Sequence, residues 1–252
     1  MAQVSRIVAL GASNLTRGLP TVVSAARTTW GDDVELLGAL GHGRSYGTPS
    51  RFAARTLPGI LQSGLWRTLD SLSPATSRGL VTDVGNDVIY EVPASLILEW
   101  VEDAVDRLQT YTADVVLTDL PVDAIKKLKV PAFIAVRTLV APRCRLTLSA
   151  AVETVDRVNY GLAQMAARRR LRFVPMRPEW YGVDPIHIRP SLWHPAWQHI
   201  LGDDVVAAGR ASWREAMGLY WMLPERQTLF GVEQARVQSG RRLRRGGKIW
   251  LF

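Results

Sequence analysis

A carboxylate and an imidazole stand three residues apart late in the chain, as Asp184 and His187 of the GVDPIH segment at 182–187. In a turn, this spacing lets the carboxylate hold one ring nitrogen of the histidine while the other nitrogen faces a nucleophile. Such an arrangement activates a serine hydroxyl for attack on an acyl group. The pair is common by chance, so the interpretation depends on finding a nucleophile and oxyanion donors elsewhere in the chain.

A serine that fits this role follows the first apolar run of the chain. Ser13 comes directly after the strand-like segment SRIVALG at 5–11 and opens a helix-like segment. Free backbone N–H groups at a helix N-terminus stabilise developing negative charge, which an acyl-transfer nucleophile needs nearby. The structural alternative is an ordinary helix N-cap serine. Ser13 is therefore the candidate nucleophile.

Two further polar segments follow strand-like runs, GHG at 41–43 and GND at 85–87. Glycine lets a backbone N–H approach a ligand closely, and the Asn86 amide is a second fixed donor. Both segments are also plain turn chemistry. Because open parallel sheets assemble their sites at the carboxyl ends of the strands, these segments are expected to meet Ser13 at one edge.

The elements that would position these residues alternate between strand-like and helix-like runs. Helical periodicity is clear after Pro93 and again over 148–170, whereas 121–144 stays unassigned. Five apolar strands separated by helices predict a parallel sheet with helices on both faces. The expected strands are at 5–11, 33–40, 78–84, 113–120 and 171–175.

In this order the four polar segments resemble those of the SGNH, or GDSL-type, hydrolases, whose blocks supply a serine, a glycine, an asparagine and a histidine. The resemblance covers about residues 5 to 202 of the 252. It implies a three-layer α/β/α sandwich with a flavodoxin-like parallel five-stranded sheet. It also implies the site residues: Ser13 as nucleophile, His187 as general base, Asp184 as its orienting acid, and an oxyanion hole made by the Ser13 backbone N–H, Gly41 and Asn86.

Two departures from the family pattern point to a specialised subfamily. Ala12 stands where the family usually has aspartate, so the first block reads GAS. The second block has two glycines, Gly41 and Gly43, and the choice of oxyanion donor between them stays open.

The resulting prediction is a cytoplasmic serine esterase that hydrolyses a small-molecule carboxylic ester with a short acyl group such as acetyl. No cofactor and no metal are expected, since Cys144 is the single cysteine and the histidines form no metal set. No apolar stretch is long enough for a membrane span. Residues 1–202 are expected to form the hydrolase-like domain, and 203–252 a C-terminal helix and basic β-like extension packed on it, with one or two short strands around Ser239 and Gly240.

Two other functions compete with this one. Residues 43–47 read G-R-S-Y-G, which matches the nucleophile elbow of α/β-hydrolases and makes Ser45 a rival nucleophile. The sequence has no HGGG-type oxyanion segment upstream of this motif, and the α/β-hydrolase interpretation would leave the GND segment without a role.

A non-catalytic protein that binds nucleic acid or another anion is the second alternative. The net charge is +8, and residues 236–248 carry six cations without an acid. The sequence holds no recognised nucleic-acid motif, and charged residues commonly protect the edge of a sheet from pairing. Nucleic acid is therefore not the expected partner.

Overall fold

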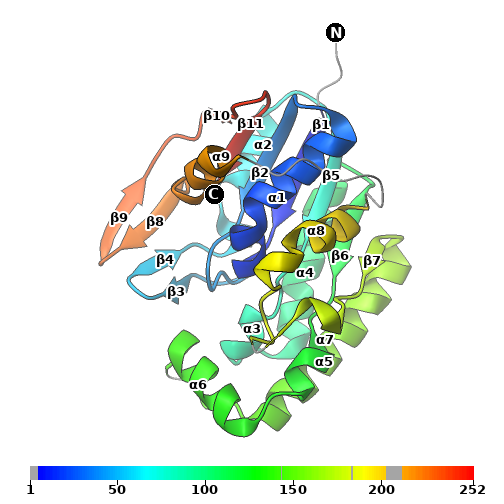
Figure 1. Ribbon diagram of the computed structural model, residues 1–252, viewed down its shortest axis with the longest axis vertical. Helices are drawn as coiled ribbons and strands as arrows, with labels where there is room; N and C mark the ends of the chain where they lie inside the picture. Colours follow the sequence, from blue (N-terminus) through cyan, green and yellow to red (C-terminus); the bar gives the residue numbers. More distant parts are fainter. Residues whose placement is uncertain (1–4, 143, 183, 203–211) are drawn as a thin grey trace.

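The computed structural model describes residues 5–142, 144–182, 184–202 and 212–252 (Figure 1). Its central sheet has seven strands in the order β10-β11-β2-β1-β5-β6-β7, and all neighbours except β10 and β11 run parallel. The five strands expected from the sequence are all present. They are β1 (Ser5–Leu10), β2 (Val34–Ala39), β5 (Thr76–Val81), β6 (Val115–Thr118) and β7 (Arg172–Val174).

The sheet has more strands than the five expected, because two strands of the C-terminal segment join it. β11 (Lys248–Leu251) pairs parallel with β2, and β10 (Arg241–Arg242) forms the antiparallel edge. The expected domain boundary at 202/203 adjoins residues outside the described ranges, so the division into two parts stays a prediction. The arginines of β10 are exposed, in line with the expectation of a charged sheet edge.

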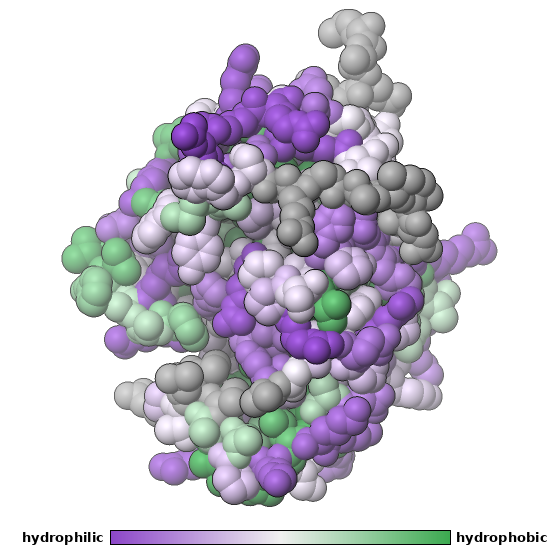
Figure 2. Space-filling view, in the orientation of Figure 1, coloured by the Kyte–Doolittle hydropathy of each residue, from purple (hydrophilic) through white to green (hydrophobic). Residues whose placement is uncertain are grey.

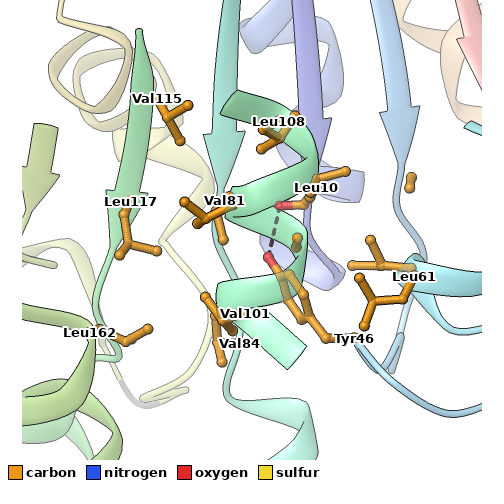
Figure 3. Packing of buried hydrophobic residues seen from close by; sticks show 14 of the residues in the cluster. Leu10, Tyr46, Leu61, Val81, Val84, Val101, Leu108, Val115, Leu117 and Leu162 are labelled. Atoms are coloured by element: carbon orange, nitrogen blue, oxygen red, sulfur yellow. Dashed lines mark hydrogen bonds between the residues drawn. The ribbon is translucent and has the colours of Figure 1, made fainter. Parts of the chain in front are cut away.

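Helices cover both faces of this sheet, which confirms the α/β sandwich. Along β1, Ile7 and Ala9 belong to one buried cluster and Val8 and Leu10 to the other, as the two-residue period of a strand requires. The first cluster includes α1 (Ser13–Trp30), α8 (Trp193–Leu201) and α9 (Trp213–Tyr220). The second includes α2 (Leu65–Ser71), α4 (Ala94–Gln109) and α7 (Leu148–Arg169). Figure 3 shows part of this second cluster, where the Tyr46 hydroxyl donates to the Leu10 carbonyl.

A second, smaller sheet stands beside the sandwich and was not expected from the sequence (Figure 1). It is antiparallel and runs in the order β3-β4-β8-β9. Its strands are β3 (Ser50–Phe52), β4 (Arg55–Leu57), β8 (Arg226–Leu229) and β9 (Val232–Ala235). The sheet therefore ties the loop that follows the second sequence block to the C-terminal segment.

The helices over 94–109 and 148–169 agree with the expected periodicity. The unassigned stretch contains α5 (Val122–Lys126) and α6 (Val130–Val140), and a short α3 (Asn86–Ile89) begins within the GND segment. Three single 3₁₀ turns complete the described helices, at Ile60–Gln62, Pro178–Trp180 and Pro190–Leu192. None of the described helices combines the length and the apolar character needed to cross a membrane.

Candidate active site

The structure brings the serine, the histidine and the aspartate into one hydrogen-bonded line. His187 Nε2 lies 2.9 Å from Ser13 Oγ, and His187 Nδ1 lies 2.6 Å from Asp184 Oδ2. Ser13 is the first residue of α1, directly after β1, as the sequence predicted. The contact joins residues 174 positions apart, so the fold brings together the three side chains that the sequence singled out.

The environment of Asp184 favours its charged form. Partial burial alone would raise the pKa of this carboxyl, but the hydrogen bond and charge of His187 act against it. The Ile186 N–H and the Arg17 guanidinium, which lies 4.0 Å from the carboxylate, also lower this pKa. The pKa of Asp184 therefore lies below its ordinary value. A carboxylate at this position orients the imidazole ring through their shared hydrogen bond.

Asp83 supports the nucleophile, and the sequence reasoning did not assign it a role. Its carboxylate accepts hydrogen bonds from the backbone N–H groups of Ala12 and Leu15, at 3.0 and 2.9 Å. Because Ala12 has no side-chain oxygen to cap α1, Asp83 caps that helix from the end of β5. Asp83 has a φ of 58°, a conformation that aspartate tolerates better than most residues. The signal in the sequence was an alanine at the helix start together with an aspartate just before the GND segment.

Asn14 joins the nucleophile region to the histidine loop. Its Nδ2 donates to Asp83 Oδ1 and to the Ile186 carbonyl, both at 2.9 Å, and its Oδ1 accepts from the Ile188 N–H at 2.8 Å. These contacts hold the backbone on each side of His187. The sequence reasoning missed Asn14 as well, because its partners lie 69 to 174 residues away.

Asn86 lies with Ser13 in the wall of one pocket, where its amide can face the reacting centre. Its Nδ2 also donates to the Arg44 carbonyl at 3.2 Å, which fixes the plane of the amide. The Arg44 guanidinium is fully buried and donates in turn to the carbonyl oxygens of Pro58 and Phe252. The C-terminal segment therefore helps to hold the second block in place.

The two glycines of the second block have different surroundings. A Cβ at Gly41 would lie 2.2 Å from Leu57 Cδ1, so a larger residue here would require the Leu57 side chain to move. Gly43 has a φ of 68°, and its carbonyl accepts from the Tyr90 hydroxyl at 2.6 Å. Within the described ranges no hydrogen bond joins Gly41 to Ser13, Asp184 or His187, so its role as oxyanion donor stays a prediction.

His42 lies between these glycines and close enough to His187 for their charges to interact. Burial, together with the charges of Arg17, Arg55 and His187, lowers the pKa of His42 to about 4. His42 is therefore neutral at neutral pH. A second positive charge beside the catalytic imidazole is thereby avoided.

The pocket beside Ser13 is mostly apolar and extends toward α5, α6 and α7. Its apolar lining includes Val88, Ile125, Leu128, Phe133, Val155 and Met176. Polar groups also line it: burial raises the pKa of Asp119 to about 6, and neither the Tyr181 hydroxyl nor Arg137 Nε has a hydrogen-bond partner among the residues that the structure describes. The pocket is suited to a largely apolar group with few polar atoms.

Ser45, the rival nucleophile, is fully buried. Its Oγ accepts hydrogen bonds from the Gly47 and Thr48 N–H groups at 3.2 and 3.1 Å and so shapes its own turn. The interpretation as an α/β-hydrolase elbow finds no support in this geometry. No cluster of three metal-ligating side chains occurs within the described ranges.

No family model matches the sequence, and the search of curated proteins finds no significant match. One solved structure resembles the chain with a TM-score of 0.52 at 15% identity, and it covers 79% of this chain and 95% of the other. A lipolytic G-D-S-L family member lies among the similar structures. It comes from Veillonella parvula and has a TM-score of 0.48 at 12% identity. The match covers 80% of this chain and 100% of the other.

TesA has a TM-score of 0.48 at 13% identity and covers 79% of this chain and 97% of its own. At these identities the likeness concerns the fold alone. The chemistry of the site therefore depends on its own residues.

Proposed function

We propose that the protein is a serine esterase of the SGNH type that uses Ser13, His187 and Asp184. The observation that carries this proposal is the unbroken line from Ser13 Oγ through the His187 ring to Asp184, at 2.9 and 2.6 Å. A serine at a helix N-terminus with its hydroxyl directed at an imidazole nitrogen is not explained by packing. It has the geometry of an activated nucleophile.

In this mechanism His187 Nε2 takes the hydroxyl proton as Ser13 Oγ forms a bond to the ester carbonyl carbon. The negative charge that develops on the carbonyl oxygen is received by the N–H groups of Ser13 and Gly41 and by the Asn86 amide. Collapse of the intermediate breaks the bond to the alcohol oxygen, which leaves with the proton from His187. Water then repeats the sequence on the acyl-enzyme, releasing the carboxylic acid and restoring Ser13.

The substrate of this proposal is a small-molecule ester with a short acyl group. The mostly apolar lining of the pocket beside Ser13 supports a substrate group with few polar atoms, such as a neutral ester. Asp119 and Tyr181 in its wall favour a substrate that carries a hydroxyl or similar group there. The cytoplasmic location remains part of the proposal.

Labelling with a fluorophosphonate tests the nucleophile directly. The wild type should be labelled, Ser13→Ala should not, and Ser45→Ala should keep its labelling because Ser45 is buried in its turn. Labelling that survives in Ser13→Ala and is lost in Ser45→Ala would replace this proposal with the elbow mechanism. A folded wild type that is never labelled would contradict both.

A panel of p-nitrophenyl esters graded by acyl length tests the substrate. A short-acyl preference predicts that kcat/KM is highest for acetyl and falls as the chain lengthens. A maximum at long chains would show instead that the apolar pocket takes the acyl chain.

A further inference from the structure

Exposed apolar side chains gather in one stretch of the chain. Eight of the twelve large hydrophobic residues that are exposed in the described structure lie between residues 213 and 237. We call these eight residues the C-terminal face: Trp213, Met217, Tyr220, Trp221, Leu223, Phe230, Val232 and Val237. Concentrations of this kind mark contact surfaces more often than isolated exposed residues do.

The helix α9 directs its apolar side outward. Trp213, Met217 and Tyr220 are spaced by four and three residues, which places them on one side of the helix. The other side is held inward by Glu215, whose buried carboxylate pairs with Arg27 at 3.0 Å. An amphipathic helix ordinarily buries its apolar stripe, so the orientation of α9 calls for a role outside the core.

The turn between β8 and β9 carries a second unusual feature. Leu229 pairs with Val232, and both turn residues, Phe230 and Gly231, have positive φ, at 49° and 82°. Such two-residue hairpin turns favour Asn-Gly, and a bulky side chain at positive φ is strained. Phe230 is nevertheless 81% exposed, so neither the fold nor the local backbone explains its presence at the tip.

The charge around this face is strongly positive. Residues 212–252 contain eight Lys and Arg against three Glu, a net of +5 out of the +8 of the whole chain. The three acids are all paired, with Arg27, Arg67 and Arg226. Arg241 donates to the Gly218 carbonyl at 3.0 Å, which holds the basic strand β10 against α9. Figure 2 shows the hydrophilic surface over β10 and β11 adjoining paler and hydrophobic surface over α9 and the β8–β9 hairpin.

We propose that the C-terminal face and its arginines dock the protein on an anionic lipid surface. Trp and Tyr side chains settle at the boundary between headgroups and hydrocarbon, and Arg binds the phosphates beside them. Aliphatic tips such as Met217 and Val232 add buried area in the acyl region. The protein lies on the bilayer in this arrangement and does not cross it.

Other occupants fit these observations less well. A second copy of the chain would bring the same excess positive charge against itself. A nucleic acid would find arginines for its phosphates and aromatic rings for its bases, but it would leave the exposed aliphatic side chains of Met217, Leu223 and Val232 without an apolar partner. An anionic bilayer matches both the charge and the aliphatic side chains.

Docking in this way would place the candidate active site near the lipid. β8 pairs with β4, and Phe52 at the neighbouring β3–β4 turn lies 5.7 Å, ring to ring, from His42. His42 interacts with His187. The docking proposal does not depend on esterase activity and can be tested in Ser13→Ala.

Co-sedimentation with phosphatidylcholine vesicles, with and without phosphatidylglycerol, tests the proposal. The wild type should bind the anionic vesicles, and raising the salt should weaken the binding. Replacing Arg241, Arg242, Arg244 and Arg245 by Gln should weaken it by about 10²- to 10³-fold. An equal affinity for both kinds of vesicle, or unchanged binding by this variant, would overturn the proposal.

Phe230→Asn provides the sharpest variant, because Asn suits the positive φ of the turn. The hairpin should become no less stable while vesicle binding falls by about tenfold, the loss expected from one interfacial aromatic side chain. Tyr160→Ser is the matched control, since Tyr160 is 70% exposed on the distant helix α7 and should not affect binding. Weakening by Tyr160→Ser as large as that by Phe230→Asn would contradict a localised surface.

Two further measurements distinguish the rival occupants. A wild-type dimer that Trp213→Ser with Trp221→Ser converts to monomer, without vesicle binding by either, would assign the face to self-association. Tight oligonucleotide binding that the arginine variant loses, without vesicle binding by the wild type, would assign it to nucleic acid. Either result would overturn the lipid proposal.

Discussion

Two carboxylates of the candidate active site, the partly exposed Asp83 and the buried Asp87, have different surroundings. On the nucleophile side, Asp83 accepts three hydrogen bonds from Ala12, Asn14 and Leu15, and its charge stands at the start of a helix. On the oxyanion side, Asp87 is fully buried and accepts from the Tyr46 N–H at 3.0 Å, while burial raises its pKa to about 6. Three hydrogen bonds from protein groups replace the water around the Asp83 carboxylate. The charge of Asp87, in contrast, is buried, and this burial lowers the stability of the protein.

The two carboxylates are therefore expected to differ in role: Asp83 positions neighbouring groups of the candidate site, whereas the charge of Asp87 affects the stability of the fold. Asp83 lies two residues before the GND segment and Asp87 is the last residue of that segment, yet we expect substitutions at Asp83 to change the rate and substitutions at Asp87 to change mainly the pH dependence of folding. The predictions below test this contrast.

Asn86→Ala should cause the largest loss of rate among these variants. Removing one oxyanion donor costs about 10²- to 10³-fold in kcat, or roughly 3 to 4 kcal/mol. Steady-state kinetics on an activated ester give the value. Asn159→Ala serves as control, because Asn159 bonds only the Leu120 backbone and should affect folding without a specific loss of rate. Unfolding of Asn86→Ala with a normal rate in its folded fraction would assign Asn86 to the turn alone.

Asp83→Ala should lower kcat by about 10- to 10²-fold and leave KM nearly unchanged, because Ser13 and the histidine loop lose their shared anchor. Loss of the helix cap should also destabilise the fold by about 1 to 2 kcal/mol. Thr147→Ala is the matched control, since Thr147 caps α7 by accepting from the Ala150 N–H at 3.2 Å and lies outside the pocket, so its loss should affect stability alone. A change in stability at Asp83 without any change in kcat would limit Asp83 to a structural role.

Asp87→Asn should stabilise the protein at neutral pH by about 1 to 2 kcal/mol, because it removes a charge that burial disfavours. The pKa of Asp87 is about 6 in the folded state and 3.8 ordinarily, so the wild type loses stability as the pH rises between those values. Denaturant unfolding should show the gain above pH 6 and none at pH 3.8. A gain that is the same at both pH values would exclude titration of Asp87 as its cause.

His42→Gln should have the smallest effect on stability. Its effect should grow as the pH falls, whereas that of Asp87→Asn grows as the pH rises. The pKa of His42 is about 4 in the folded state against 6.5 ordinarily, so its contribution to stability is present above pH 6.5 and declines as the pH falls toward 4. The variant should gain no more than about 1 kcal/mol over the wild type near pH 4, since the half-exposed ring is partly screened. Identical slopes of stability against pH in the two proteins would contradict this assignment.

The fold was largely predictable because its signals are local. The apolar runs of β1, β2, β5, β6 and β7 and the helical periodicity of α4 and α7 each report how one element buries one face. The second sheet escaped prediction, since its strands are three or four residues long and mostly polar or exposed. Pairing partners that lie far apart along the chain decide such strands, and no periodicity records them.

The candidate site divides in the same way. The sequence by itself determined the residue types and their places at strand ends, which were enough to select Ser13, Asp184, His187 and Asn86. Only the tertiary structure decided that Asp83 caps the helix of Ser13 and that Asn14 holds the loop of His187, across 68 to 174 residues. The reason is physical: hydrogen-bond partners depend on which loops packing brings within 3 Å, whereas a helix or strand is already favoured by its own neighbours in the chain.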